Sequence, residues 1–395
     1  MSLKDELLKK PVGPSVPARK TNPDKDFTRQ IEVSGDVAAV TVRGLPDEVD
    51  ESAAADYLRS KGEDPELWIA TGFRSGEWTM ANGDLGVSNR YTFKRRDPVL
   101  DGEPLDLDEL IRAVDNYASG VTVSQTSGDH TFIVAIGDMQ FGKIDGDGVE
   151  GTLQRTIECL NKAASLVEHY RRRFEIGHIH IAWLGDHIEG FVSQGGANTW
   201  RTVLTLNEQI RLTRRVMLHA LLLFSPMADR ITMAAVPGNH GEAVRINGKG
   251  VTRYDDSHDT ESLIAVKDAA DLSPERFGHV EFYVPDTDEL SVVVECSGTV
   301  VAHVHGHQFR PGKHFDYWKG QAFNRASAFH QADLLLAGHL HHEHVDTDGF
   351  RTFIQPPAME SESTWWRHAK GTTGAPGLIV AVTKDGNTNL KEVVR

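Results

Sequence analysis

Three buried apolar segments in the middle of the chain each end at a glycine, which is followed by a side chain able to bind a metal. Amphipathic stretches at 152–173 and 200–223 separate them, and this alternation predicts parallel strands joined by crossover helices. Because ligands bind beyond the carboxyl ends of such strands, we expect the three side chains to share one crevice. The segments are 131–136 with Gly137-Asp138, 178–184 with Gly185-Asp186, and 230–236 with Gly238-Asn239-His240.

Two histidine-rich segments, His303-Val304-His305-Gly306-His307 and Gly338-His339-Leu340-His341, continue the pattern. Carboxylate, amide oxygen and imidazole together suit divalent metals such as Mn, Fe, Zn or Ni. The only cysteines are Cys159 and Cys296, which excludes a disulfide scaffold and a cysteine-rich zinc site. The sequence therefore predicts a metal centre built from Asp, Asn and His.

In this order the five segments resemble the motifs of the calcineurin-like metallophosphoesterase superfamily, which are D-x-H, G-D, G-N-H-[DE], a lone His and G-H-x-H. The match covers residues 131–345. The resemblance implies an α/β fold, a layered metallophosphoesterase β-sandwich flanked by helices. It also implies a centre of two divalent metal ions at which water attacks a phosphoester in line with the leaving oxygen.

The resemblance gives each matching residue a role. Asp186 would bridge the two ions, while His240 would contact the phosphate and protonate the leaving oxygen without binding a metal. For the lone-His motif, His305 matches better than His303, and both stay open. The other ligands would be Asp138, Gln140 and His341 for the first ion, and Asn239 and His339 for the second.

Gln140 departs from the superfamily pattern, which usually has His at this position. An amide carbonyl oxygen can bind a metal, but it is a harder and weaker ligand than imidazole. We therefore expect Mn²⁺ as the cofactor ion, with Mg²⁺ next, and Fe, Ni or Zn as alternatives. A degenerate centre that only binds a partner or DNA is the non-enzymatic alternative.

The chain divides into three parts by composition. Residues 1–26 are polar and rich in Pro and Lys, which predicts a flexible arm. Residues 27–125 predict a small N-terminal α+β module, and 129–395 predict the catalytic domain.

Two groups of residues outside the motifs are candidates for substrate binding. Lys94, Arg95 and Arg96 close a module rich in aromatic residues, a combination that suits stacking and phosphate contact with a nucleic-acid strand. A solvated strand face and an aromatic core explain the same residues without function. Trp365 and Trp366 could stack a base or pack against the sheet.

The substrate class is open at the sequence level. DNA is favoured, through an exonuclease or endonuclease activity, since the chain resembles SbcD-type repair exonucleases and stand-alone bacteriophage metallophosphoesterases. A small-molecule (cyclic nucleotide) phosphodiesterase is the alternative. A phosphomonoesterase or protein phosphatase is less favoured, because residues 185–190 lack the Arg of that class. The net charge of −15 opposes strong duplex binding. An ATPase partner or self-association would therefore supply the additional contacts to DNA.

The N-terminus, MSLKDELLKK, lacks an apolar signal core, and the chain has no apolar run of 18 residues. The sequence therefore predicts no membrane association and a cytoplasmic location, in the host cytoplasm if the chain is of phage origin.

Overall fold

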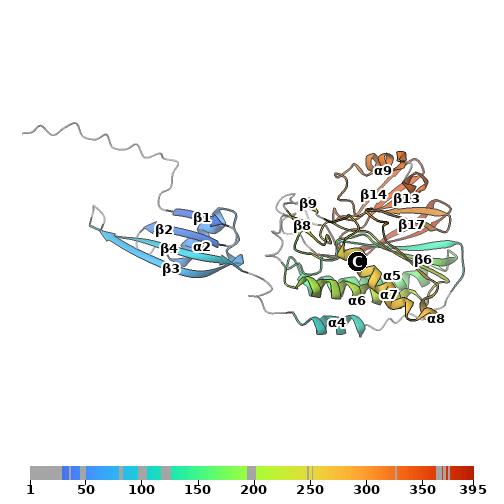
Figure 1. The fold of residues 1–395 in the computed structure, drawn as a ribbon, viewed down its shortest axis with the longest axis horizontal. Helices are drawn as coiled ribbons and strands as arrows, with labels where there is room; N and C mark the ends of the chain where they lie inside the picture. The colour runs from blue at the N-terminus through green and yellow to red at the C-terminus, as the bar shows by residue number, and fades with distance from the viewer. Residues whose placement is uncertain are drawn as a thin grey trace, which may run out of the picture. The chain divides into compact units, whose positions relative to one another are not determined.

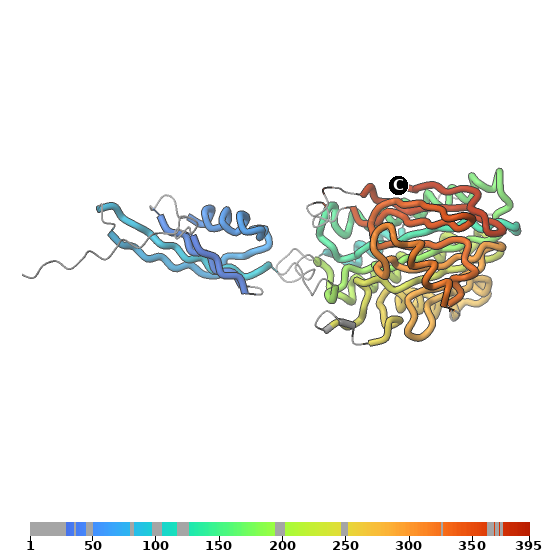
Figure 2. The backbone as a smooth tube through the Cα atoms, turned by 90° about the horizontal axis from the view of Figure 1, so that it is seen from above, coloured from blue at the N-terminus to red at the C-terminus, as the bar shows by residue number. Residues whose placement is uncertain are grey.

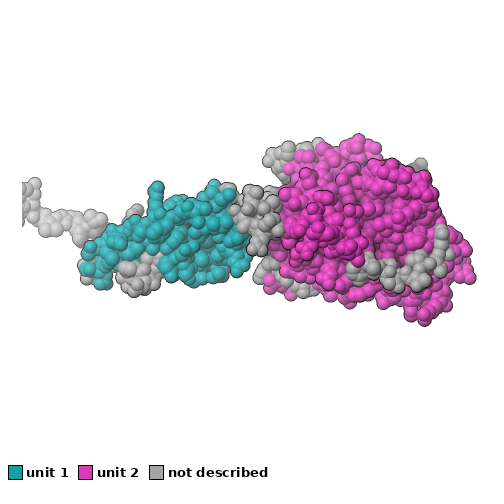
Figure 3. All heavy atoms as spheres, turned by 90° about the horizontal axis from the view of Figure 1, so that it is seen from below, with its two compact units in different colours: residues 1–96 teal, residues 97–395 magenta. Residues whose placement is uncertain are grey.

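Two compact units, residues 1–96 and 97–395, make up the chain and are coloured separately in Figure 3. The predicted arm at 1–26 and both Trp365 and Trp366 lie outside the described residues. The computed structural model describes residues 29–34, 37–44, 50–79, 83–96, 105–116, 126–193, 202–246, 249–250, 252–324, 327–361, 367, 371 and 374–395.

The N-terminal unit is a four-stranded antiparallel sheet in the order β1-β2-β4-β3, covered by the helix α2. Asp50 starts that helix by accepting a hydrogen bond from the backbone of Ala53. The long β3–β4 hairpin can be followed in Figure 2. The elements are β1 (Arg29–Ser34), β2 (Val37–Gly44), α2 (Glu51–Ser60), the 3₁₀ turn η2 (Pro65–Leu67), β3 (Trp68–Thr79) and β4 (Leu85–Arg95).

Aromatic residues of this unit divide between its core and its surface. Trp68, Tyr91 and Phe93 are buried with the alanines and valines of β2. Phe73 and Trp78, both on β3, keep 59% and 41% of their surface exposed. The core therefore accounts for three of these aromatic residues and leaves two on the surface.

The second unit contains a six-stranded sheet in the order β10-β7-β6-β5-β16-β17. Its first four strands are parallel, as the strand–helix alternation predicts, and β16 and β17 add antiparallel pairs at one edge. The strands are β5 (His130–Ile136), β6 (Ile176–Trp183), β7 (Arg230–Ala235), β10 (Val280–Tyr283), β16 (Leu378–Lys384) and β17 (Asn387–Val394).

A five-stranded sheet, in the order β11-β12-β13-β15-β14, faces the first across an apolar layer. Ile133, Ala182 and Ala234 of the first sheet pack there against Val301 and Leu336 of the second. The strands are β11 (Val292–Cys296), β12 (Thr299–His303), β13 (Leu334–Leu336), β14 (His344–Asp348) and β15 (Arg351–Gln355). A short pair, β8 (Arg245–Ile246) and β9 (Lys249–Gly250), follows β7.

Helices cover the outer faces of both sheets (Figure 1). The first sheet carries α5, α6, α7 and α8, and the second carries α9 with the turn η4. This confirms the predicted α/β class, a layered β-sandwich flanked by helices with a small N-terminal α+β module. The helices are α5 (Gly148–Tyr170), α6 (Leu206–Phe224), α7 (His258–Asp271), α8 (Pro274–Phe277), α9 (His314–Phe323) and η4 (Ala328–Gln331).

The helix α4 (Leu107–Asp115) belongs to the second unit, although the predicted N-terminal module extends to residue 125. Its apolar residues Leu110 and Val114 are buried in the core formed with α5 and α6. Burial of this apolar face places the division between the units at Arg96 and Asp97. No helix among the described residues is both long and apolar enough to span a membrane.

Candidate metal centre

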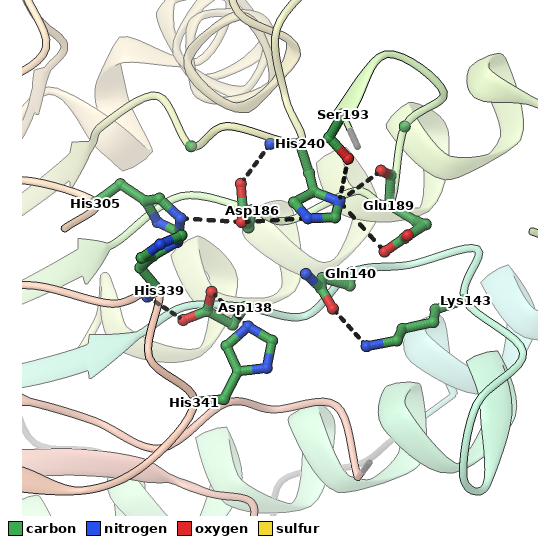
Figure 4. A network of polar contacts seen from close by, with 12 residues as sticks. Asp138, Gln140, Lys143, Asp186, Glu189, Ser193, His240, His305, His339 and His341 are labelled. Atoms are coloured by element: carbon green, nitrogen blue, oxygen red, sulfur yellow. Dashed lines mark hydrogen bonds and ion pairs between the residues drawn. The ribbon is translucent and has the colours of Figure 1, made fainter. Parts of the chain in front are cut away.

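The polar side chains predicted to bind metals converge at the carboxyl ends of strands from both sheets (Figure 4). Asp138 follows β5, Asp186 follows β6, and the loops after β12 and β13 bring His305, His339 and His341. Among the described residues, Asp186, His305 and His339 form a group whose potential ligand atoms all lie within 4.8 Å of one another.

Strained backbone marks these loops. Asp138, Gln140, Asp186, His339 and His341 all have positive φ, between 44° and 74°. Such angles are uncommon outside glycine and persist only where the surroundings enforce them, which is typical of functional sites. The loops are therefore held in conformations that their sequences would not choose alone.

Asp138 and His341 define one position in the centre. The Asp138 carboxylate is fully buried, and its Oδ1 lies 3.2 Å from Nε2 of His341. The other ring nitrogen of His341, Nδ1, lies 2.8 Å from Oε1 of Glu360. Burial lowers the pKa of His341, but the carboxylates of Asp138 and Glu360 outweigh it and raise that pKa to about 10. The two carboxylates thus favour positive charge here.

Asp186, His305 and His339 define a second position, where their potential ligand atoms come together. Nδ1 of His305 donates to the carbonyl oxygen of Leu184 at 2.7 Å, which leaves Nε2 facing Oδ2 of Asp186 at 2.9 Å. Although burial raises it, His305 and His240 hold the pKa of Asp186 well below its usual range. The glycine before Asn239 is required, because a Cβ on Gly238 would lie 2.0 Å from Oδ1 of Asp186.

The structure separates His305 from His303, which the sequence left as alternatives. The strand β12 ends at His303, whose ring is buried between the sheets. Its Nε2 lies 2.7 Å from Nε2 of His180, and its Nδ1 lies 3.1 Å from the carbonyl oxygen of Val292. His305 comes after the strand and reaches Asp186, so only His305 joins the candidate centre.

Gln140 lies at the centre, but its carbonyl oxygen points elsewhere. Oε1 accepts a hydrogen bond from Nζ of Lys143 at 2.9 Å (Figure 4). Since an ammonium group can only donate, the atom that faces it must be the oxygen. The amide nitrogen therefore points toward the centre, and an amide NH₂ has no lone pair for a metal. This arrangement differs from the expected binding through the carbonyl oxygen.

His240 lies next to Asp186, and residues of the loop after β6 orient its ring. Its Nδ1 lies 2.9 Å from the carbonyl oxygen of Glu189 and 3.2 Å from Oγ of Ser193. A carbonyl oxygen only accepts, so Nδ1 carries a hydrogen and Nε2 faces Asp186, 4.0 Å from its Oδ2. Burial lowers the pKa of His240, but the carboxylates of Asp186 and Glu189 raise it to about 9.

Asp259 supports the centre and has no signal in the sequence. It is fully buried near the start of α7 and accepts hydrogen bonds from three backbone N–H groups. Oδ2 bonds Asp186 at 3.0 Å and Gly238 at 2.9 Å, and Oδ1 bonds His187 at 2.9 Å. One carboxylate thus ties the loop after β6 to the loop after β7.

The residues present fit a pair of divalent ions. Oδ1 of Asn239 is buried without a hydrogen-bond partner, as a metal ligand would be before it binds. His305 and His341 each anchor one ring nitrogen on an acceptor, Leu184 and Glu360 respectively, and turn the other inward. Such anchoring is typical of metal-binding histidines.

Of the candidate substrate residues, Lys94, Arg95 and Arg96 belong to the N-terminal unit, and Trp365 and Trp366 are outside the described part of the chain. Lys94 and Arg96 are exposed near the end of β4, in the N-terminal unit. Arg95 is half-buried, pairs with Glu63 at 3.1 Å and covers the ring of Trp68 at 5.1 Å. Arg95 therefore stabilises its own unit.

Comparison with known proteins gives low similarity. A conserved uncharacterized protein from Streptococcus pneumoniae TIGR4, titled a predicted phosphoesterase, matches over 65% of this chain and 84% of its own, with 14% identity and a TM-score of 0.28. A structure titled a novel archaeal phosphodiesterase matches over 67% and 99%, with 12% identity and a TM-score of 0.30. Zinc-complexed Vps29 from Entamoeba histolytica matches over 42% and 81%, with 16% identity and a TM-score of 0.24.

No family model and no curated protein matches the chain. At these identities and TM-scores, similarity to solved structures carries no functional weight. The side chains of the centre therefore have to carry the functional interpretation.

Proposed function

We propose that this chain is a dinuclear-metal-dependent phosphodiester hydrolase of the calcineurin-like metallophosphoesterase type, acting on DNA. The observation that carries the proposal is the convergence of Asp138, Asp186, His305, His339 and His341 around one point at the carboxyl ends of the strands. An isolated Asp or His after a strand has many structural explanations. Five of them around one point, four of which have positive φ, favour a metal centre, as do the inward-facing ring nitrogens of His305 and His341.

The ligands divide between two ions that share Asp186. Asp138 and His341 would hold the first ion, and Asn239, His305 and His339 the second. Divalent ions in these positions, Mn²⁺ being the first choice, would neutralise the phosphoryl oxygens of the substrate. The chain's own contribution is to hold these ligands in place, through Asp259 for the loops of Asp186 and Asn239 and through Glu360 for His341.

His240 is the proposed general acid. The carbonyl oxygen of Glu189 fixes Nδ1, so the proton to be transferred resides on Nε2, on the side that faces Asp186. The carboxylates of Asp186 and Glu189 favour the imidazolium form. His240 can therefore deliver a proton to the leaving oxygen as the phosphodiester bond breaks.

Gln140 would act as a hydrogen-bond donor within the centre. Lys143 occupies its carbonyl oxygen, so the amide N–H groups are available to an oxygen of the phosphate group. The first ion then has two carboxylates and one imidazole from the protein. This oxygen-rich set favours Mn²⁺ or Mg²⁺ over Zn²⁺.

The preference for DNA is supported by the surface of the N-terminal unit. Trp78 on β3 and Lys94 on the neighbouring strand β4 are exposed, and they share one face of the sheet because Trp78 pairs with Gly86. Aromatic and basic side chains on one sheet suit stacking on bases and contact with phosphates. A small-molecule phosphodiesterase is the alternative, since the centre by itself suits any phosphodiester.

The experiment that tests this function compares substrates and metals directly. The purified chain is incubated with labelled single-stranded, duplex and nicked DNA, and in parallel with cyclic nucleotides, in Mn²⁺, Mg²⁺, Ni²⁺ or Zn²⁺. Metal-dependent cleavage of DNA supports the proposal. Cleavage of cyclic nucleotides alone would favour the alternative.

A further inference from the structure

The convergence of potential ligand atoms that marks the candidate centre recurs once more among the described residues. His314, His344 and Asp346 each offer one ligand atom, and these atoms all lie within 4.8 Å of one another. None of the three belongs to the motifs from which the proposed function is argued. The group therefore needs an explanation of its own.

The fold builds this group from two separate elements of the second sheet layer. His344 and Asp346 lie two residues apart on β14, so their side chains leave the same face of the strand. His314 begins α9, the helix that covers this sheet (Figure 1). Side chains 30 residues apart in the sequence thus meet at the edge of the sheet (His314 and His344).

Packing against Phe353 fixes both imidazoles. The ring of His314 is 3% exposed and stacks on Phe353, with 4.1 Å between the ring centroids. The ring of His344 meets Phe353 nearly edge-on at 5.5 Å and meets His314 at right angles at 5.1 Å. Because core packing holds the rings, little conformational freedom would be lost on binding a ligand.

The contacts within the group leave ligand capacity unused. Nε2 of His314 lies 3.1 Å from Oδ2 of Asp346, and this contact accounts for two of the three residues. His344 adds a second imidazole beside the same carboxylate. A cation between the three side chains would satisfy both rings and the carboxylate.

We propose that His314, His344 and Asp346 form a further metal site, separate from the candidate centre. Two imidazoles and one carboxylate suit a borderline divalent ion such as Zn²⁺, Co²⁺ or Ni²⁺ rather than Mg²⁺. The Asp346 side chain is 48% exposed, so the remaining coordination positions are open to water. The site stands independently of the proposed function, since none of its residues belongs to that centre.

The position of the site suggests what the ion does. The strand β14 begins at His344, three residues after His341 of the candidate centre. An ion that joins β14 to α9 would anchor the loop that carries His339 and His341. The site is therefore assigned a structural role, to stabilise that loop.

Metal stoichiometry of the full chain tests this proposal. Zn²⁺ or Co²⁺ bound per chain is measured by elemental analysis after gel filtration, for the wild type, His344→Ala, Asp346→Asn and Asp348→Asn. Asp348 lies on the same strand, is exposed and pairs with Lys319, so its variant is the matched control. We expect His344→Ala and Asp346→Asn to bind one ion fewer than the wild type, and Asp348→Asn to bind the same number.

Two further measurements keep the test decisive. Asp186→Asn should lose ions from the candidate centre but keep this one, which separates the two sites. Added Zn²⁺ should also raise the melting temperature of the wild type more than that of Asp346→Asn, whose exposed substitution leaves the core intact. Equal stoichiometry and an equal thermal shift in the wild type and Asp346→Asn would overturn the proposal.

Discussion

Nζ of Lys143 lies 2.9 Å from the carbonyl oxygen of Gln140 and 3.3 Å from Oε2 of Glu360. The same carboxylate holds Nδ1 of His341 through its other oxygen. One ammonium group therefore orients both the amide of Gln140 and the carboxylate that anchors a candidate metal ligand. This link decides which atom of Gln140 faces the centre.

Replacement of Gln140 tests that orientation. Gln140→Ala should leave the affinity of the first ion almost unchanged, because the amide nitrogen binds no metal. Gln140→His should raise the affinity for Zn²⁺ or Mn²⁺, because imidazole supplies a lone pair. Calorimetric titration of the metal-free protein measures both. If Gln140→Ala weakens metal binding as much as Asp138→Asn does, Gln140 is a ligand and the interpretation is wrong.

Asp259 should be essential for the centre although it binds no metal. Asp259→Ala leaves three buried backbone N–H groups without an acceptor, at about 1–3 kcal/mol each. We expect a large loss of stability in urea denaturation and loss of bound metal. Asp268→Asn, on an exposed position of the same helix, is the control. Normal metal content in a folded Asp259→Ala protein would contradict the supporting role.

His240→Ala should keep both ions but lose rate, by about 10²–10⁴-fold if His240 is a general acid. The loss should be smaller for esters of good leaving groups such as p-nitrophenolate, which need no proton. Rates on a series of leaving groups measure this dependence. An equal loss across the series would argue against proton transfer by His240.

Buried histidines between the sheets should make the fold sensitive to acid. Burial lowers the pKa of His178 to about 3, while in the unfolded chain it stays near 6.5. Below pH 6.5 the unfolded state therefore binds a proton that the folded state does not. The free energy of unfolding consequently decreases as the pH is lowered. We expect the free energy of unfolding to be about 2–3 kcal/mol lower at pH 4.5 than at pH 7. Urea denaturation at the two pH values measures this loss. In His178→Gln, the difference in the free energy of unfolding between pH 7 and pH 4.5 should be smaller than in the wild type. An unchanged difference would contradict the role assigned to His178.

We expect the N-terminal unit to contribute to DNA binding but not to the hydrolysis of the phosphodiester bond. Deletion of residues 1–96 should spare hydrolysis of small phosphodiesters and weaken cleavage of DNA, and Trp78→Ala should reproduce part of that loss. Deletion to residue 125 should instead destabilise the protein, because it removes Leu110 and Val114 from the core of the second unit. A folded truncation at residue 96 that cuts DNA as well as the full chain would refute the positioning role.

Local sequence signals were sufficient for part of this structure. Apolar runs that end at glycine predicted the parallel strands and placed Asp138 and Asp186 at their carboxyl ends. The start of α6 was less accurate, since a capping box of Thr205 and Glu208 begins that helix after the predicted residue 200. The Thr-x-x-Glu signature of that box is present in the sequence, but the apolar periodicity used to place the helix does not resolve it.

Long-range contacts account for what the sequence could not reveal. Asp259 reaches the backbone of Asp186 across 73 residues, and Glu360 reaches His341 only through the return of the chain after β15. The orientation of Gln140 depends on Lys143, a residue that no motif includes. Likewise, His303 and His305 could be distinguished only by where β12 ends.

Hydrolysis of bis-p-nitrophenyl phosphate by the metal-loaded full chain, compared with Asp186→Asn under the same conditions, tests the central claim most directly. The account predicts turnover that depends on Mn²⁺ or another divalent ion, is abolished by a chelator and restored by the metal, and is lost in a folded Asp186→Asn variant. Absence of turnover with every metal, or equal turnover in Asp186→Asn, would contradict a phosphodiesterase centre built on Asp186.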